Sequence, residues 1–178
     1  MISKDTALLV IDIQVGVKFI ANHFYKNLTQ TKLNQIIKNN QRLVDSFQQK
    51  GLPFFIVTVA PPFFSKNLKK KFTKSLLSFS KEAFQITKEG PSAFKNTNLE
   101  SLLKMNGIHS LVITGISTDN GVLKTEKTAK KLGFQTVILS DATGAKNKNT
   151  QLKALSNFEN VQKTNDYLNE LLDCKKCK

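Results

Sequence analysis

The stretch between residues 111 and 122 reads Leu111-Val-Ile-Thr-Gly-Ile-Ser-Thr-Asp-Asn-Gly-Val122. It predicts a buried strand, a tight turn and the start of a helix, with Gly121 at the helix opening. Backbone N–H groups at a helix start carry the positive end of the helix dipole, so the turn is a candidate cradle for an oxyanion or a carboxylate. The alternative is a plain strand-to-helix connection in which Gly121 only allows close packing.

Strands and helices alternate outward from this stretch along the whole chain. Residues 7–11 form a continuous apolar run, which indicates a strand covered on both faces, as in a parallel sheet. Thr97 and Glu100 form a capping-box pattern with Thr97 as the N-cap. Helices are predicted over residues 29–50, 97–107, 120–132, 150–157 and 165–173, and further strands over residues 53–59, 83–87, 110–114, 134–139 and near 161. This order predicts a doubly wound α/β fold: a mostly parallel sheet between two layers of helices, in one domain over residues 1–178 with a short charged tail.

The chain carries a formal net charge of +14, from 27 Lys and Arg against 13 Asp and Glu. Arg42 is the single Arg, and the Lys residues are spread along the chain. Specific readers of phosphates and bases rely on the planar Arg fork, so the sequence argues against a nucleic-acid partner and favours a solvated lysine surface. No apolar run approaches the ~20 residues that span a bilayer, and nothing resembles a signal peptide, so we expect a cytoplasmic protein without a membrane partner.

Two charged residues follow the predicted strands at their carboxyl ends, where α/β sheets gather functional groups. Asp12 closes the first strand, and Lys88 follows the third, directly before a turn of small residues. A Lys beside Asp12 would offset the charge of the carboxylate and keep it ionised. The alternatives are a loop-fixing Asp12 and an ordinary surface Lys88. Asp141, at the end of the fifth strand, is expected to be structural.

Two further features have weaker implications. Residues 60–81 predict a long loop with short helical pieces on the substrate side of the sheet. Cys174 and Cys177 have the spacing of a redox motif but lie in a charged tail without a second pair, so we interpret them as a solvated tail whose thiols a reagent would label.

Three segments together resemble the isochorismatase-like hydrolase superfamily, also called the cysteine hydrolase family. The matching pieces are Leu8-Leu-Val-Ile-Asp-Ile-Gln14, Lys88-Glu-Gly-Pro-Ser-Ala-Phe94 and Leu111-Val-Ile-Thr-Gly-Ile-Ser-Thr118, followed by Ser140-Asp-Ala142. Each piece is short, but their order and spacing cover nearly the whole chain.

The resemblance implies an Asp–Lys–Cys triad. Asp12 matches the acid/base and Lys88 matches the lysine, whereas the position of the nucleophilic cysteine falls on Gly121. Since glycine has no side chain, the family's route through a thioester is closed here.

The resemblance also implies a non-proline cis peptide bond between Ile116 and Ser117. We expect Gln14, Ser117 and Thr118 to contact the substrate.

Two branches of the family bear on the chemistry. Isochorismatases proper carry glycine at this position and cleave a vinyl ether, with the Asp as proton donor and water completing the hydrolysis. They carry polar Gln and Arg after the second strand, where this chain has Val59-Ala-Pro-Pro-Phe-Phe64. Nicotinamidases need a metal held by an Asp and histidines after the second strand, and neither His23, in the first loop, nor His109 lies there. His23 remains a candidate for the pocket wall.

The sequence leaves two functions open. The leading one is an isochorismatase-like hydrolase that acts on a small molecule, for which an anion is a candidate, by acid–base chemistry with water as the nucleophile. The alternative is a catalytically inactive homologue that binds a small metabolite or a protein partner, and the apolar start of residues 60–81 favours it. We expect no metal and no cofactor, and the resemblance implies a homo-oligomer, either a dimer or a tetramer.

Overall fold

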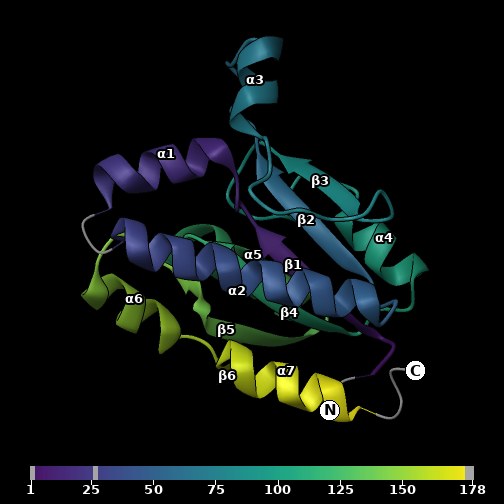
Figure 1. Cartoon of the computed structure of the whole chain (residues 1–178). Helices are drawn as coiled ribbons and strands as arrows, with labels where there is room; N and C mark the ends of the chain where they lie inside the picture. The colour runs from purple at the N-terminus through teal and green to yellow at the C-terminus, as the bar shows by residue number, and fades with distance from the viewer. Residues whose placement is uncertain (1–2, 26–27, 175–178) are drawn as a thin grey trace.

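A computed structural model describes residues 3–25 and 28–174. It contains six strands and a set of helices that alternate along the described chain (Figure 1). The strands are β1 (Thr6–Ile11), β2 (Phe54–Val59), β3 (Phe84–Lys88), β4 (Ser110–Ile116), β5 (Gln135–Gly144) and β6 (Val161–Gln162). The helices are α1 (Val15–Phe24), α2 (Gln30–Gln49), α3 (Lys66–Phe72), α4 (Leu99–Met105), α5 (Leu123–Lys131), α6 (Lys148–Leu155) and α7 (Thr164–Asp173), with a π-helical turn at Thr118–Val122.

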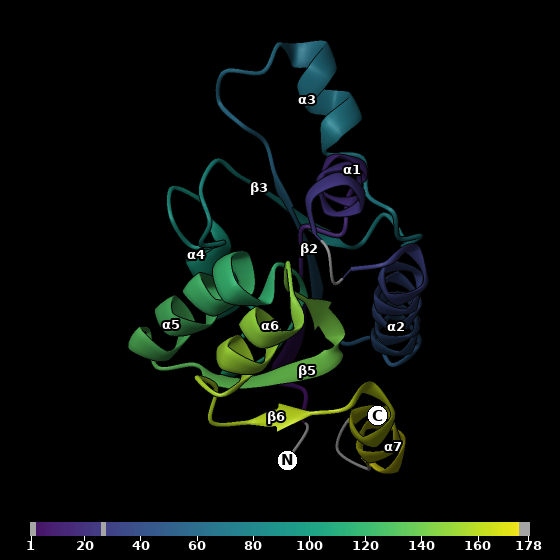
Figure 2. The same cartoon turned by 90° about the vertical axis from the view of Figure 1, so that its left-hand side faces the viewer.

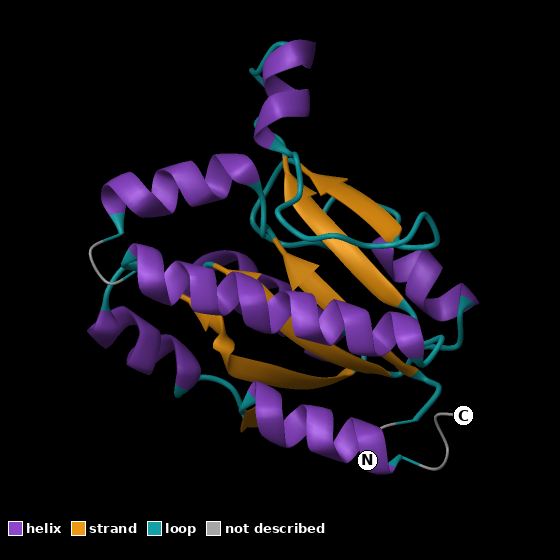
Figure 3. Ribbon diagram, in the orientation of Figure 1, coloured by secondary structure: helices purple, strands orange, loops and turns teal. Residues whose placement is uncertain are grey.

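The strands form one parallel sheet in the order β3-β2-β1-β4-β5-β6. β2 and β3 are added in turn on one side of β1, and β5 and β6 are added in turn on the other side of β4 (Figure 3). The predicted doubly wound α/β fold is therefore confirmed. The point where the winding reverses lies between β1 and β4, which is where ligands bind in open sheets of this kind.

Helices cover both faces of the sheet, as Figure 2 shows: α2 and α7 lie on one side, and α4, α5 and α6 on the other. Alternate residues of β1 enter separate cores, because successive side chains of a strand point to opposite faces. Leu8 and Val10 pack with α2 and α7, whereas Leu9 and Ile11 pack with α4 and α5. This two-sided burial accounts for the unbroken apolar run in the sequence.

The structure corrects the sequence prediction in the segment after β1, which holds a helix, α1, instead of a loop. Gly16 lies where α1 meets α3, and a Cβ there would lie 2.1 Å from the Phe72 ring. Glycine and β-branched residues lower the helix propensity of this segment, so the sequence pattern gives little indication of the helix. Its packing against α3 and against the core around Ala21 stabilises it.

The capping box was also predicted wrongly. The N-cap of α4 is Asn98, the Thr97 hydroxyl donates to the Ala93 carbonyl at 2.6 Å, and Glu100 pairs with Lys104 one turn later. Thr97 thus fixes the preceding turn, and Glu100 does not reach back.

The prediction that Cys174 carries a free thiol is wrong. Cys174, which follows α7, is disulfide-bonded, and the described residues hold no free cysteine. Cys177 lies outside the described residues. No helix within the described ranges has both the length and the apolar character that crossing a membrane requires.

Candidate functional site

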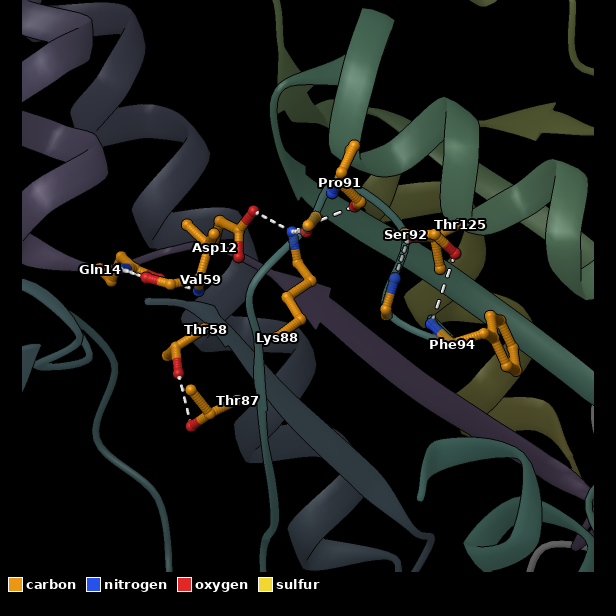
Figure 4. Close-up of polar contacts among 12 residues, drawn as sticks. Asp12, Gln14, Thr58, Val59, Thr87, Lys88, Pro91, Ser92, Phe94 and Thr125 are labelled. Carbon is orange, nitrogen blue, oxygen red and sulfur yellow. Dashed lines mark hydrogen bonds and ion pairs between the residues drawn. The ribbon is translucent and has the colours of Figure 1, made fainter. Parts of the chain in front are cut away.

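The carboxyl ends of β1, β3 and β4 bring Asp12, Lys88 and Gly121 together, and Figure 4 shows the contact between Asp12 and Lys88. Asp12 follows β1 directly, Lys88 is the last residue of β3, and Gly121 lies in the π-helical turn after β4. Gly115 allows this approach at a break in the β4–β5 register, since a Cβ there would lie 1.9 Å from the Ile11 carbonyl oxygen.

Asp12 and Lys88 form a buried ion pair. The Lys88 Nζ donates to Asp12 Oδ2 at 2.7 Å, and the two side chains are only 1% and 6% exposed. The same Nζ donates to the carbonyl oxygens of Gly90 at 3.2 Å and Pro91 at 3.1 Å. An ammonium has three N–H donors, so these contacts use all of them. The turn after β3 therefore holds Lys88 in place over Asp12.

Asp12 combines three unusual properties. Its φ of +56° lies in the left-handed region, which non-glycine residues rarely adopt and which concentrates at functional sites. Its Oδ1 is buried and has no hydrogen-bond partner among the residues that the structure describes. Burial raises the pKa of Asp12 from 3.8 to about 6, although the charge and hydrogen bond of Lys88 act in the opposite direction. The carboxyl can therefore change its protonation state near neutral pH.

Gly121 faces this carboxyl. A Cβ at Gly121 would lie 3.4 Å from Asp12 Oδ2 and 3.2 Å from Ile11 Cγ2, the nearest side-chain atom. A side chain at this position would thus stand against Asp12, as the resemblance implies for a nucleophile. The peptide bond between Ile116 and Ser117 is cis, which confirms that prediction.

These groups line a pocket of about 320 Å³. Its walls are apolar side chains from α1 and the strand ends, including Val17, Ile20, Val59 and Ile116. Polar atoms come from Ser117, Tyr25 and Asn120, and Glu89 adds a carboxylate from the turn after β3. The remaining lining residues are Asp12, Lys88, Gly90, Pro91 and Gly121.

Gln14 and Thr118 are occupied by structural contacts. The Gln14 amide donates to the carbonyls of Val59 at 2.9 Å and Phe72 at 3.1 Å, and accepts from the Val59 N–H at 2.8 Å. The Thr118 hydroxyl donates to Gln151 of α6 at 2.7 Å. Both residues are fully buried and neither lines the pocket, so their geometry favours a role in the scaffold over contact with a substrate.

Ser117 does line the pocket, next to a residue that the sequence analysis missed. The Tyr25 side chain shares a hydrogen bond with Ser117, and burial raises the pKa of its hydroxyl. Tyr25 follows α1, so its place over the site depends on that unpredicted helix. The pocket residues Glu89, in the segment after Lys88, and Asn120, beside Gly121, were also missed. No sequence pattern marks either of them as a pocket residue.

Other candidates lie away from this pocket. His23 is exposed, with Nδ1 2.7 Å from the Phe19 carbonyl, and it does not line the pocket. The Asp141 carboxylate accepts from the backbone N–H and the hydroxyl of Thr164, both at 2.8 Å, which confirms its structural role at the start of α7. The described residues contain no cluster of three or more metal-ligating side chains.

Comparison with known proteins gives consistent results. A family model described as the Isochorismatase domain matches residues 6–167. An uncharacterized isochorismatase family protein of Escherichia coli O157:H7 is 30% identical over 159 residues, which cover 80% of this chain and 81% of that protein. An Arabidopsis thaliana protein named probable inactive nicotinamidase is 28% identical over 167 residues, which cover 80% of this chain and 82% of that protein. A solved structure of a putative hydrolase of the isochorismatase family from Chromobacterium violaceum ATCC 12472 matches with a TM-score of 0.78 and 25% identity, over 98% of this chain and 97% of that one.

Proposed function

The chain belongs to the isochorismatase family, and we propose that it hydrolyses a small molecule by acid–base chemistry without a cysteine nucleophile. The observation that carries this proposal is the buried Asp12–Lys88 pair, which lines a pocket together with Gly121 and in which Asp12 Oδ1 has no partner among the described residues. A family of hydrolases supplies the class of reaction, and the chain's own residues supply the means.

Asp12 is the proton donor and acceptor of this mechanism. In its protonated form it gives its proton to the leaving group of the bound substrate as the scissile bond breaks. A water molecule adds to the carbon that loses the leaving group, and its proton returns to the Asp12 carboxylate. A pKa near 6 leaves both protonation states accessible at neutral pH.

Lys88 positions Asp12 and balances its charge. Because its three donors hold Asp12, Gly90 and Pro91, Lys88 is a positioning residue and does not itself transfer a proton. Gly121 leaves space beside the carboxyl, which a water molecule or the substrate can occupy.

A second candidate function is binding without catalysis. It is supported by the exposed Phe63 in the segment after β2, where the polar substrate-holding residues of isochorismatases are expected. A relative named probable inactive nicotinamidase adds to this support.

A hydrolase screen of amides, esters and vinyl ethers tests the two functions. The proposal predicts turnover that Asp12→Asn abolishes, whereas Asp45→Asn, which alters an exposed carboxyl on α2, leaves it unchanged. Ligand binding with no turnover of any compound would instead establish the non-catalytic function.

A further inference from the structure

The ionisable side chains that line the pocket have an unexpected balance. Although the chain carries +14 overall, the pocket is lined by one cationic side chain, Lys88, and two carboxyl groups, Asp12 and Glu89. The many other lysines that the structure describes do not line this pocket. The local charge is thus opposite in sign to that of the molecule.

Lys88 has no donor to offer a ligand. Its three N–H groups point to Asp12, Gly90 and Pro91 within 3.2 Å, and the side chain is almost fully buried. A carboxylate in the pocket would have to break one of these contacts to gain a cationic partner. It would also face Asp12 and Glu89, and like charges in a partly enclosed site repel more strongly than in water.

Asp12 has the opposite property, an acceptor that lacks a donor. Its Oδ1 is buried and unpartnered within the described protein, and Asp12 as a whole is only 5% exposed. A buried acceptor without a partner is costly, so a ligand N–H or O–H that reaches this atom removes that cost.

We propose that this pocket selects uncharged or positively charged small molecules that donate a hydrogen bond to Asp12 Oδ1, and that it excludes carboxylates. The inference names the substrate class of the site under "Proposed function" and rests on that assignment, but it concerns binding and does not require turnover. It also reverses the expectation of an anionic substrate, because the lysines that suggested one lie elsewhere.

Three probes of similar size test the proposal: benzamide, benzylamine and benzoate, which are neutral, cationic and anionic at neutral pH. Their dissociation constants are measured on the full chain by titration NMR, at about 0.3 M salt to screen the surface lysines. Shifts at the Gly90, Ser117 and Gly121 amides locate the binding. Benzamide and benzylamine should bind and cause such shifts. The dissociation constant of benzoate should be higher than theirs by a factor of about ten or more.

A pair of charge reversals provides the matched control. Glu89→Lys places a cation at an exposed position that lines the pocket. It should strengthen the binding of benzoate and weaken the binding of benzylamine, each by about fivefold. Glu82→Lys makes the same change in net charge at an exposed position away from this pocket. It should leave all three constants unchanged.

Several outcomes would overturn the proposal. These are benzoate binding as tightly as benzamide, equal effects of the two charge reversals, or no binding of any probe at millimolar concentration. The hydrolase proposal fails separately, through the absence of turnover in the screen, while these dissociation constants would stand.

Discussion

At the scale of single residues, Gly121 stands where the family resemblance implies the nucleophilic cysteine. A Cβ here would lie 3.4 Å from Asp12 Oδ2, and its tightest contact would be the Ile11 side chain at 3.2 Å. We therefore expect Gly121→Cys to fold and to place a thiol beside a carboxyl that can take its proton. Hydrolysis of an activated ester such as p-nitrophenyl acetate should rise about tenfold or more over the native chain, with a burst that reports an acyl-enzyme.

Two variants control this experiment. Gly121→Ala adds the Cβ without the sulfur and should show no gain. In Gly121→Cys combined with Asp12→Asn, alkylation of the new thiol should slow. Equal alkylation rates with and without the Asp12 carboxyl would contradict the predicted contact.

The ionisation of Asp12 gives a second prediction at this scale. Burial raises its pKa to about 6, and Lys88 limits the rise. If the protonated form is the proton donor, kcat/KM should fall as the pH increases through about 6. Lys88→Met removes the opposing charge and should move the Asp12 titration upward, as carboxyl NMR would detect. A titration that moved downward would contradict the assigned effect of Lys88.

The same shift makes stability depend on pH. The folded pKa lies above the unfolded value of 3.8, so the folded state binds the proton more tightly. The contribution of Asp12 to stability is present below pH 3.8 and is lost as the pH rises through about 6, by on the order of 3 kcal/mol. The unfolding free energy of the native chain, compared with Asp12→Asn by urea titration, should fall over this interval.

At the scale of helices and strands, the sequence was most informative where burial and periodicity agree. The apolar stripe of α2 and the apolar run of β1 identified those elements nearly to their ends. It failed at α1, which packs against α3, a segment far away in the sequence, and against the core around Ala21. It predicted α4 correctly but placed its N-cap at Thr97 instead of Asn98, because a capping-box pattern does not reveal that the Thr97 hydroxyl donates to the Ala93 carbonyl.

The Gln14 side-chain amide joins the end of β2 to the end of α3 through hydrogen bonds to Val59 and Phe72. Gln14→Ala leaves the Val59 N–H and two carbonyls without partners, and we expect a loss of about 3 kcal/mol of unfolding free energy. Hydrogen exchange at the Val59 amide should accelerate. Gln41, whose amide makes similar bonds to Ser78 but is exposed to solvent, provides the control: Gln41→Ala should cost less than about 1 kcal/mol. Unchanged stability together with weaker ligand binding in Gln14→Ala would restore Gln14 as a substrate contact.

At the scale of the whole molecule, the winding of the sheet explains why the site was predictable. Asp12 and Lys88 are 76 positions apart in sequence, yet each lies at the carboxyl end of a strand, and these ends lie at the same edge of the sheet. The topology therefore brings them together without any local signal. The sequence could not predict which hydrogen bonds each polar group makes. Lys88 uses its three donors on Asp12, Gly90 and Pro91. The Gln14 amide bonds the backbone of Val59 and Phe72, and the Tyr25 side chain bonds Ser117.

Oligomeric state also belongs to this scale and remains a prediction. Helix α3 projects from the body and contacts α1 (Figures 1 and 2). Phe19 on α1 and Phe63 before α3 are largely exposed, and exposed apolar patches mark association sites. Light scattering should show a homo-oligomer that Phe19→Lys with Phe63→Lys dissociates. Met105, on α4, is as exposed as Phe63 at 82%, so Met105→Lys is the control and should leave the mass unchanged. A monomeric native chain at micromolar concentration would contradict the prediction.

The net charge of +14 predicts non-specific electrostatic binding to polyanions such as DNA. Dispersed lysines bind DNA only by releasing counterions, so affinity for duplex DNA should fall by about 10³ between roughly 50 and 200 mM salt and should not depend on sequence. The densest lysine run is Lys69–Lys71 on α3, the helix that stands away from the body. If it contacts DNA, replacing all three lysines by Gln should reduce the slope of log affinity against log salt by about 2.7, since each phosphate contact contributes about 0.9. Two duplexes of equal length and different sequence, compared by fluorescence anisotropy, complete the test. A preference for one of them that persists at about 0.2 M salt would mean that the lysine surface reads bases, which a chain with a single Arg is not expected to do.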